Sequence, residues 1–157
     1  MSNFKVLMLY PNIQTEMMPP PVMALFSALL KREGFKVELF DTTNYEIETE
    51  FVDPTKGTRR KMTNTETVKA NLLLVRPSPI LAREIKITSA YEDFRRQIES
   101  FGPDLIMVTA TENMFPMAVN LLSYVDDLGV PTVLGGVFAS FAPDLALRWT
   151  AGDMVCV

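Results

Sequence analysis

Pro103-Asp104-Leu105-Ile106-Met107-Val108-Thr109-Ala110-Thr111 is a short apolar run that ends in small residues, and Val133-Leu134-Gly135-Gly136 is a second one. Between them lies one helix-length segment, Met114 to Leu128. This pattern predicts a strand, a small-residue turn, a helix and a second strand, which is a βαβ unit with parallel strands. Both turns then fall at the carboxyl ends of adjacent strands, where open α/β sheets bind their ligands.

The rest of the chain repeats this unit, with further apolar runs that predict strands at 4–10, 36–41 and 154–157. Three prolines begin the first predicted helix, and its apolar face is expected to consist of Val22, Leu25, Phe26, Leu29 and Leu30. Strands and helices that alternate with short turns predict an α/β, Rossmann-like (flavodoxin-like) fold. We expect a doubly wound sheet of five parallel strands in the order 2-1-3-4-5, with its switch point between the first and third strands.

Residues 42–88 do not fit this repeat, and we interpret them as an insertion after the second strand, with one helix around Asn64 to Leu73. Regularity resumes at Ser89 and Glu92, which form the pattern of a capping box. The chain stops as the fifth strand ends, before the loop and helix that we expect next. We therefore interpret residues 1–157 as the N-terminal domain of a larger protein.

Composition excludes several classes of protein. The net charge of −4 argues against a nucleic-acid surface, which needs clustered Lys and Arg. The longest apolar run falls well short of the ~20 residues of a membrane span. The single cysteine, Cys156, excludes a disulfide framework and indicates a reducing compartment, so we expect a cytoplasmic protein. We expect Cys156 to be a buried strand residue rather than a nucleophile.

The chain contains no histidine. This absence excludes Ser-His-Asp and Cys-His nucleophile systems and most zinc sites. We predict no catalytic residue and no metal ligand in this chain.

The small-residue turns are the candidate ligand site. Thr109 and Thr111 offer two hydroxyls at a strand end, and Gly135 and Gly136 let the backbone approach a large flat ligand. The alternative is that the glycines only make a tight turn and the threonines cap the next helix. The predicted site residues are Pro11, Asn12, Gln14, Thr109, Ala110, Thr111, Asn113, Gly135, Gly136, Val137, Phe138 and Ala139.

Apolar residues follow the glycines. We interpret Val137, Phe138 and Ala139 as a platform under the ligand, and we expect Phe141 to pack in the core. The first turn, Pro11-Asn12-Ile13-Gln14, lacks both the acidic pair of a receiver domain and the glycines of a flavodoxin phosphate loop. A dinucleotide fingerprint is also absent from the sequence.

The order and spacing of several short motifs resemble a known family, the N-terminal cobalamin-binding domain of cobalamin-dependent radical S-adenosylmethionine enzymes. The resemblance covers essentially the whole chain and is carried by Lys5 to Pro11, Glu33 to Asp41, Tyr91-Glu92-Asp93-Phe94, Pro103-Asp104-Leu105-Ile106, Gly135-Gly136 and Asp153-Met154-Val155. The insertion and Tyr91-Glu92-Asp93-Phe94 look most like the magnesium-protoporphyrin monomethyl ester oxidative cyclase subgroup.

The resemblance implies a cobalamin that lies on the carboxyl edge of the sheet. Relatives of the methionine-synthase type ligate cobalt with a histidine in the first turn, and this chain has none, so the implied binding is base-off without a histidine ligand. Many radical-enzyme relatives have histidine where this chain has Phe138. The 4Fe-4S cluster and S-adenosylmethionine would belong to a C-terminal domain absent from this chain, since no three-cysteine motif is present. That domain is the expected partner.

Two alternatives remain open from the sequence. One is a protein-interaction domain that has kept the fold and lost the cofactor, and the other is a flavin or nucleotide binder. The fragment alone is not expected to be catalytic. The full protein would be an oxidoreductase, cyclase or methyltransferase of the radical type.

Overall fold

The computed structural model describes residues 3–13, 21–52, 59–63, 85–149 and 152–157. Within these residues, one sheet has five parallel strands in the order β2-β1-β5-β6-β7. The strands are β1 (Lys5–Tyr10), β2 (Lys36–Asp41), β5 (Leu105–Thr109), β6 (Thr132–Gly135) and β7 (Met154–Val155). Counted along the chain without the hairpin described below, this is the predicted order 2-1-3-4-5. The predicted Rossmann-like doubly wound sheet is therefore confirmed.

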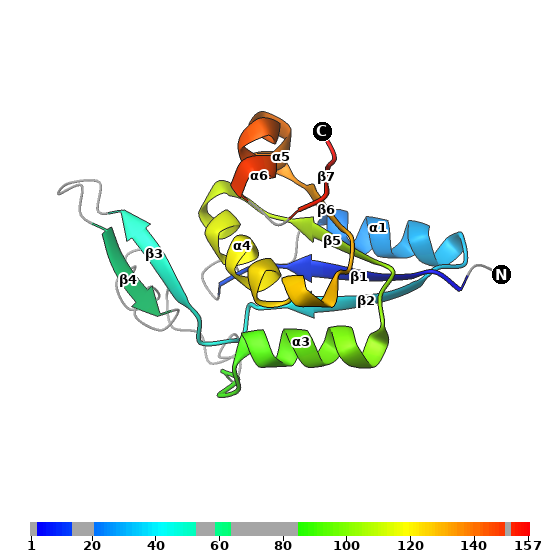
Figure 1. Cartoon of the computed structure of the whole chain (residues 1–157), viewed down its shortest axis with the longest axis horizontal. Coiled ribbons are helices and arrows are strands. Elements are labelled where there is room, and N and C mark those ends of the chain that lie inside the picture. The colour runs from blue at the N-terminus through cyan, green and yellow to red at the C-terminus, as the bar shows by residue number, and fades with distance from the viewer. Residues whose placement is uncertain (1–2, 14–20, 53–58, 64–84, 150–151) are drawn as a thin grey trace.

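Helices cover the two faces of the sheet unequally. Figure 1 shows α3 and α4 on one side of the sheet and α1 on the other. Two short 3₁₀ turns, η1 and η2, flank α4, so the helix expected over 114–128 is divided into three pieces. The bounds are α1 (Pro21–Arg32), α3 (Ala90–Phe101), η1 (Glu112–Met114), α4 (Phe115–Tyr124), η2 (Asp126–Leu128), α5 (Val137–Phe141) and α6 (Pro143–Trp149).

The helix ends follow the local sequence signals. The Ser89 hydroxyl accepts a hydrogen bond from the Glu92 amide at 3.4 Å, as the capping box predicts. Gly102 ends α3 in the left-handed conformation, at a φ of 60°. Pro21 is the first residue of α1, which confirms that the proline triplet precedes a helix.

The main core lies between the sheet and the helices α3 to α6. It contains Leu7 and Leu9 from β1, Ile106 from β5, Phe94 from α3 and Leu121 from α4, all at most 1% exposed. Strand β1 is buried on both faces, as expected for the central strand of a parallel sheet. A smaller cluster joins Val6, Met8 and Tyr10 to Met23 on the α1 side.

The prediction for the apolar face of α1 was partly wrong, because Val22 and Leu30 pack toward the sheet as expected but Leu25 and Phe26 do not. Met23 is 5% exposed and packs on the sheet, whereas Leu25 is 56% and Phe26 41% exposed. The physical reason is that α1 is apolar on almost every side, so its sequence spacing is compatible with several faces. Contact with β1 selected the side of Met23 and Leu30.

The insertion contains a β-hairpin that the sequence analysis did not predict. Strands β3 (Glu48–Val52) and β4 (Arg59–Thr63) pair antiparallel and form a sheet of their own, seen at the left of Figure 1. The helix predicted around 64–73 lies outside the described residues.

The two ends of the insertion meet beside the domain. Tyr45 and Lys86 form a parallel bridge, and the Lys86 amide donates a hydrogen bond to the Asn44 carbonyl at 2.7 Å. The Lys86 ammonium also donates to the Tyr45 hydroxyl at 3.0 Å and stands 4.3 Å from the centre of its ring. These contacts close the insertion at its base, so it leaves the regular α/β repeat on either side undisturbed.

Two further expectations concern membrane crossing and the burial of the single cysteine. In the described part of the chain, no helix combines the length and the apolar character that crossing a membrane requires. Cys156 is exposed, so the expectation that it is buried was wrong. It follows β7 at the edge of the sheet, where fewer neighbours cover the chain than at the central strands.

Candidate functional site

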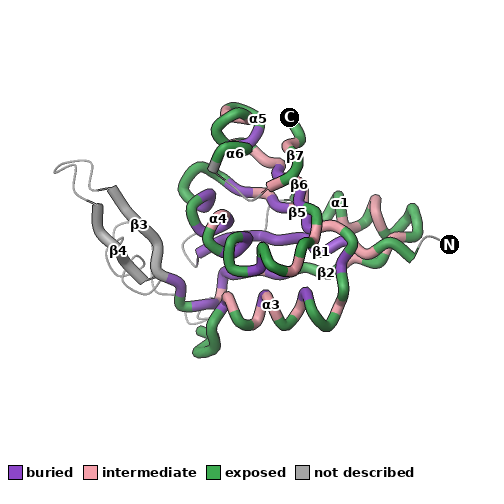
Figure 2. Tube along the Cα trace, in the orientation of Figure 1, coloured by how far each residue is buried: buried purple, intermediate pink, exposed green. Residues whose placement is uncertain are grey.

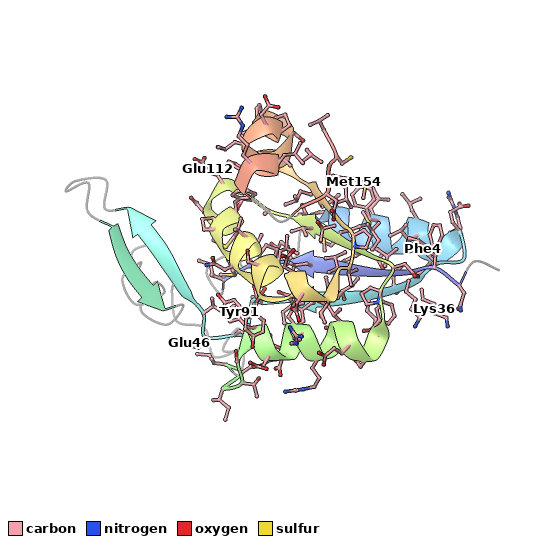
Figure 3. The ribbon with its side chains drawn as sticks, viewed as in Figure 1. Phe4, Lys36, Glu46, Tyr91, Glu112 and Met154 are labelled. Carbon is pink, nitrogen blue, oxygen red and sulfur yellow. The ribbon has the colours of Figure 1, made fainter. Side chains whose placement is uncertain are left out.

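Three turns lie side by side at the carboxyl edge of the sheet. They follow β1, β5 and β6, which are neighbours in the sheet. The chain leaves β1 toward β2 on one side and leaves β5 toward β6 on the other, so the switch point lies between β1 and β5, as predicted. Glu112, labelled in Figure 3, begins the 3₁₀ turn that follows the β5 turn.

Gly136 brings the β6 turn into contact with the β5 turn. A Cβ built on Gly136 would lie 2.6 Å from the Thr109 Oγ1 and 3.1 Å from the main-chain nitrogen and oxygen of Ala110. Its φ of 92° is in the region that glycine adopts most readily. The second glycine of the pair is therefore required by the chain's own packing, as the tight-turn alternative proposed.

Gly135 has no such constraint. It pairs with Thr109 across the sheet, and the nearest atom to an added Cβ would be the Val108 carbonyl oxygen at 3.8 Å, an ordinary contact. The missing side chain at Gly135 therefore leaves main chain open at the strand end. This is the property that the ligand interpretation needs.

The hydroxyl of Thr111 is exposed at the same edge. Thr111 precedes η1, and its side chain makes no capping hydrogen bond to that turn. Its carbonyl instead accepts hydrogen bonds from the amides of Met114 and Phe115. The alternative that Thr111 serves as a side-chain cap is therefore not seen, and the hydroxyl faces outward with Asn113, which is also exposed.

Asn12 occupies a different environment. It is fully buried, its amide donates to the Thr42 hydroxyl at 2.7 Å, and its side-chain Nδ2 donates to the Thr43 hydroxyl at 2.8 Å. The Thr42 hydroxyl donates in turn to the Asn12 carbonyl at 2.8 Å. These hydrogen bonds join the β1 turn to the residues that directly follow β2, and they fix the position of that turn.

The apolar residues after the glycines separate into three environments. Val137 is 62% exposed, and Ala139 is 3% exposed in the core. Phe138 is half-buried, and the centroid of its ring lies 4.3 Å from the centroid of the Phe115 ring. Of the proposed platform, Val137 and the outer part of Phe138 are therefore accessible. Phe141 is 86% exposed, so its expected core packing was wrong. The five-residue helix α5 turns Ala139 inward, which leaves Phe141 pointing away.

The remaining predicted site residues are mostly buried or half-buried where the structure describes them. Pro11 is fully buried, Ala110 is 7% exposed, and Thr109 is half-buried beside Gly136. Gln14 lies outside the described residues. The structure therefore brings the β5 and β6 turns together at one exposed edge, whereas the described residues of the β1 turn are buried.

Residues that the sequence analysis missed support this edge. Thr42 and Thr43 are buried and hold Asn12, and Phe115 supports Phe138. The signal was present in Asp41-Thr42-Thr43, since short polar residues directly follow the strand beside β1. The Asp41 carboxylate accepts hydrogen bonds from the amide and the hydroxyl of Thr43, which orients that hydroxyl.

A charged cluster lies at the base of the insertion. The Tyr45 hydroxyl donates to the Asp93 carboxylate at 3.0 Å, and the Thr88 hydroxyl donates to it at 2.7 Å. The bond from Thr88 is the main cause that lowers the pKa of Asp93 below its usual value, and burial raises the pKa of Tyr45. These groups join the insertion to α3, so their charges are paired within the chain.

Metal ligation by side chains finds no support among the residues that the structure describes. No group of three or more Cys, Asp or Glu side chains there is arranged to hold a metal ion, and the sequence has no histidine. The described residues of the edge can therefore bind a ligand through hydrogen bonds, through close approach to the main chain at Gly135 and through apolar contacts.

Comparison with known proteins assigns the family. The profile of the B12 binding domain matches residues 79–157, just over half of the chain. The matched part contains the Thr109 turn and the glycine pair, and it begins inside the insertion, after β1 and β2. A search of curated proteins finds no match. With the five-stranded parallel sheet, the profile match establishes that the chain belongs to the B12-binding domain family.

Proposed function

We propose that this chain binds cobalamin across the carboxyl ends of β5 and β6, base-off and without a histidine on the cobalt. The observation that carries the proposal is the open main chain at Gly135, beside the contact between Gly136 and Thr109, in a domain of the B12-binding family. Membership of the family supports cobalamin as the ligand. The absence of histidine from the sequence supports the mode of binding.

The residues of the edge fit a large flat group. Gly135 would let the ligand approach the main chain, and the Thr111 hydroxyl would hydrogen-bond to its amide substituents. Val137 and the exposed part of Phe138 would contact its apolar surface and exclude water from it. Asn12, through Thr42 and Thr43, would keep the β1 turn from moving when the ligand binds.

We further propose that the domain works as the N-terminal module of a radical S-adenosylmethionine enzyme. Bound cobalamin would supply a cobalt centre that can carry a methyl group or an electron. The present chain has a single cysteine, so a three-cysteine iron–sulfur site would have to come from another domain. The role of residues 1–157 would be to hold and orient the cofactor, and the insertion supports the cyclase-like subgroup by resemblance.

Retention of the cofactor tests the binding. The chain is incubated with hydroxocobalamin and desalted, and the visible spectrum of the protein fraction is recorded. We expect retained colour and a spectrum that differs from that of free cobalamin. Loss of all colour on desalting would contradict the proposal and favour a protein-interaction domain of the same fold.

A pair of variants locates the ligand. Gly135→Leu adds bulk at the open main chain, where an added Cβ meets no clash of the kind found at Gly136, so we expect at least a ~10-fold weaker affinity. Ser123→Leu places the same bulk on the exposed surface of α4 and should bind like the parent. Circular dichroism checks that both variants fold. Equal affinity of the two variants for cobalamin would show that the ligand does not bind at the β6 turn.

Paramagnetic resonance tests the mode of binding. In the reduced Co(II) form, a nitrogen ligand on cobalt produces superhyperfine splitting of the cobalt lines. We expect the protein-bound form to lack this splitting, because the chain has no imidazole and the nucleotide base would be detached. A bound spectrum with nitrogen splitting would contradict the base-off proposal while leaving cobalamin binding intact.

A further inference from the structure

Residues 41–45 connect the turn that follows β1 with the base of the insertion. Asp41 ends β2, and Thr42, Thr43 and Tyr45, which follow it, are at most 4% exposed. Figure 2 shows mostly the buried colour along this part of the chain, between β2 and β3. The polar groups of a buried segment need hydrogen-bond partners, and those of this segment lie on two sides of it.

On one side, the segment holds the turn that follows β1. The Asn12 amide donates a hydrogen bond to the Thr42 hydroxyl at 2.7 Å, and the Asn12 side-chain nitrogen donates to the Thr43 hydroxyl at 2.8 Å. The register of the sheet pairs Leu9 with Val108, so the β1 turn and the β5 turn begin side by side. The position of Thr42 and Thr43 therefore determines where the β1 turn lies beside the proposed cobalamin site.

On the other side, the segment joins the insertion to α3. The Tyr45 hydroxyl donates to the Asp93 carboxylate of α3 and accepts from the Lys86 ammonium, each at 3.0 Å. The Lys86 amide donates to the Asn44 carbonyl at 2.7 Å, where the chain returns from the insertion. We call these contacts among Asn44, Tyr45, Lys86 and Asp93 the basal contact. It closes the insertion, because Tyr45 and Lys86 lie near its two ends.

A single turn joins the two sides of the segment. The Tyr45 amide donates to the Thr42 carbonyl at 2.9 Å, which closes a β-turn. The first residue of this turn holds Asn12, and the last residue forms the basal contact. The Thr43 amide also donates to the Asp41 carboxylate at 2.8 Å, which anchors the turn to β2. A movement of Tyr45 out of the basal contact would therefore strain the hydrogen bond between Thr42 and Asn12.

The arrangement has a consequence for ligand binding. While the basal contact is formed, the 42–45 turn is held at both ends, so the β1 turn is already ordered when a ligand arrives. Without the contact, these residues have more conformations in the free protein, and binding has to restrict them at a cost in entropy. A ligand at the carboxyl edge should therefore bind more tightly when the insertion is closed. Linkage is reciprocal, so the bound ligand should stabilise the closed insertion by the same factor.

We propose that the basal contact regulates the affinity of the carboxyl edge for cobalamin, acting through the 42–45 turn and Asn12. Closure of the insertion raises the affinity, and bound cobalamin keeps the insertion closed. The inference rests on the proposed function for its ligand, and it adds a role for the insertion in that function. Tyr45, Lys86 and Asp93 are then positioning residues, because they act on the edge through Asn12.

The first test compares the affinities of variants for hydroxocobalamin, titrated by its visible spectrum. Tyr45→Phe removes the hydroxyl and keeps the ring, whose centroid lies 5.6 Å from that of Phe40, so we expect a folded chain with ~5-fold weaker affinity. Lys86→Met should have a similar effect. The double variant should bind about as weakly as either single variant, because both changes open the same contact.

Tyr124→Phe is the matched control. The Tyr124 hydroxyl also donates to a carboxylate of α3, that of Glu92, but it joins α3 to α4 rather than to the insertion. The variant loses a hydrogen bond of the same kind, so it should bind hydroxocobalamin like the parent. Circular dichroism and urea unfolding check that every variant is folded under the conditions of the titration.

Amide hydrogen exchange tests the reverse direction. The Lys86 amide reports on closure, because it donates to the Asn44 carbonyl across the base of the insertion. Saturation of the parent with hydroxocobalamin should slow exchange of this amide ~5-fold, the factor expected from linkage. The Gly129 amide, which donates to the Asp126 carbonyl after α4, is the control and should keep its rate.

The outcomes separate this inference from the proposed function. A parent chain that retains no hydroxocobalamin would overturn both. If the parent binds but Tyr45→Phe binds equally well, or if the ligand leaves exchange at Lys86 unchanged, the inference is wrong and the proposed function stands. Equal losses of affinity in Tyr45→Phe and Tyr124→Phe would also overturn the inference, because the effect would then be one of general stability.

Discussion

Gly136 lies against Thr109 so closely that a Cβ on the glycine would stand 2.6 Å from the threonine Oγ1. The contact joins the turns after two neighbouring strands, β5 and β6. It makes Gly136 a structural residue of the edge, whereas a Cβ on Gly135 beside it would make only an ordinary contact. The two glycines of one motif therefore have different roles, and substitutions can separate them.

Gly136→Ala should destabilise the folded chain by on the order of 1–3 kcal/mol, because the methyl group meets Thr109 and the main chain of Ala110 at a positive φ. Gly135→Ala meets nothing closer than 3.8 Å and should change stability by about 0.5 kcal/mol or less. Urea unfolding measures both. Equal midpoints for the two variants would contradict the assigned roles.

Asn12→Ala should also destabilise the chain, by about 1–3 kcal/mol, since it removes a buried hydrogen bond to the Thr43 hydroxyl. Asn113→Ala is the control, because Asn113 is exposed on the neighbouring turn and should tolerate the change. Thermal unfolding by circular dichroism compares the two. If Asn12→Ala melted with the parent, the β1 turn would not depend on this contact.

Phe138→Ala should reduce stability by about 1–3 kcal/mol, because the ring packs 4.3 Å from that of Phe115 and is half-buried. Phe141→Ala, three residues away, removes a ring that is 86% exposed and should have an effect of about 0.5 kcal/mol or less. Urea unfolding again provides the measurement. A larger loss for Phe141→Ala would restore the core role that its sequence position suggested.

Thr88→Val should raise the pKa of Asp93 toward its usual value, because the Thr88 hydroxyl is the largest of the interactions that favour the ionised form. The folded pKa of Asp93 is below the usual value of an aspartate, so this carboxylate contributes stability that is present above the usual pKa and is lost as the pH falls through the folded pKa. The difference in stability between the parent and Thr88→Val should therefore be full at neutral pH and shrink in acid. Carboxyl NMR titration measures the pKa directly. Thr111→Val is the control, and an unshifted Asp93 in Thr88→Val would refute the assignment.

Local signals predicted much of the fold correctly. Strands buried on both faces, the capping box at Ser89 and the proline start of α1 each depend on residues that are near one another in sequence. The strand order expected for a doubly wound sheet with this alternation of strands and helices is the order observed. The hairpin β3–β4 was missed because the polar, turn-rich insertion has no apolar alternation that would indicate strands.

The candidate site was predicted less completely. The sequence indicated that two small-residue turns would meet, and they do, at Thr109 and Gly136. It could not separate Gly135 from Gly136, or the buried Asn12 from the exposed Asn113, because each pair consists of identical residue types in turns. The partners that distinguish them, such as Thr43 for Asn12, lie 31 residues away in the chain.

By itself, the sequence determined which segments form the strands of the parallel sheet and its longer helices, because periodicity and caps act over a few residues, whereas the short helix α5 was not predicted. It also determined that no imidazole is present to bind cobalt. Only the tertiary structure decided which side of α1 packs on the sheet, that Phe141 points outward and that Asn12 is enclosed. Those outcomes depend on contacts between residues that are far apart in the chain, such as Asn12 with Thr43 and Met23 with β1.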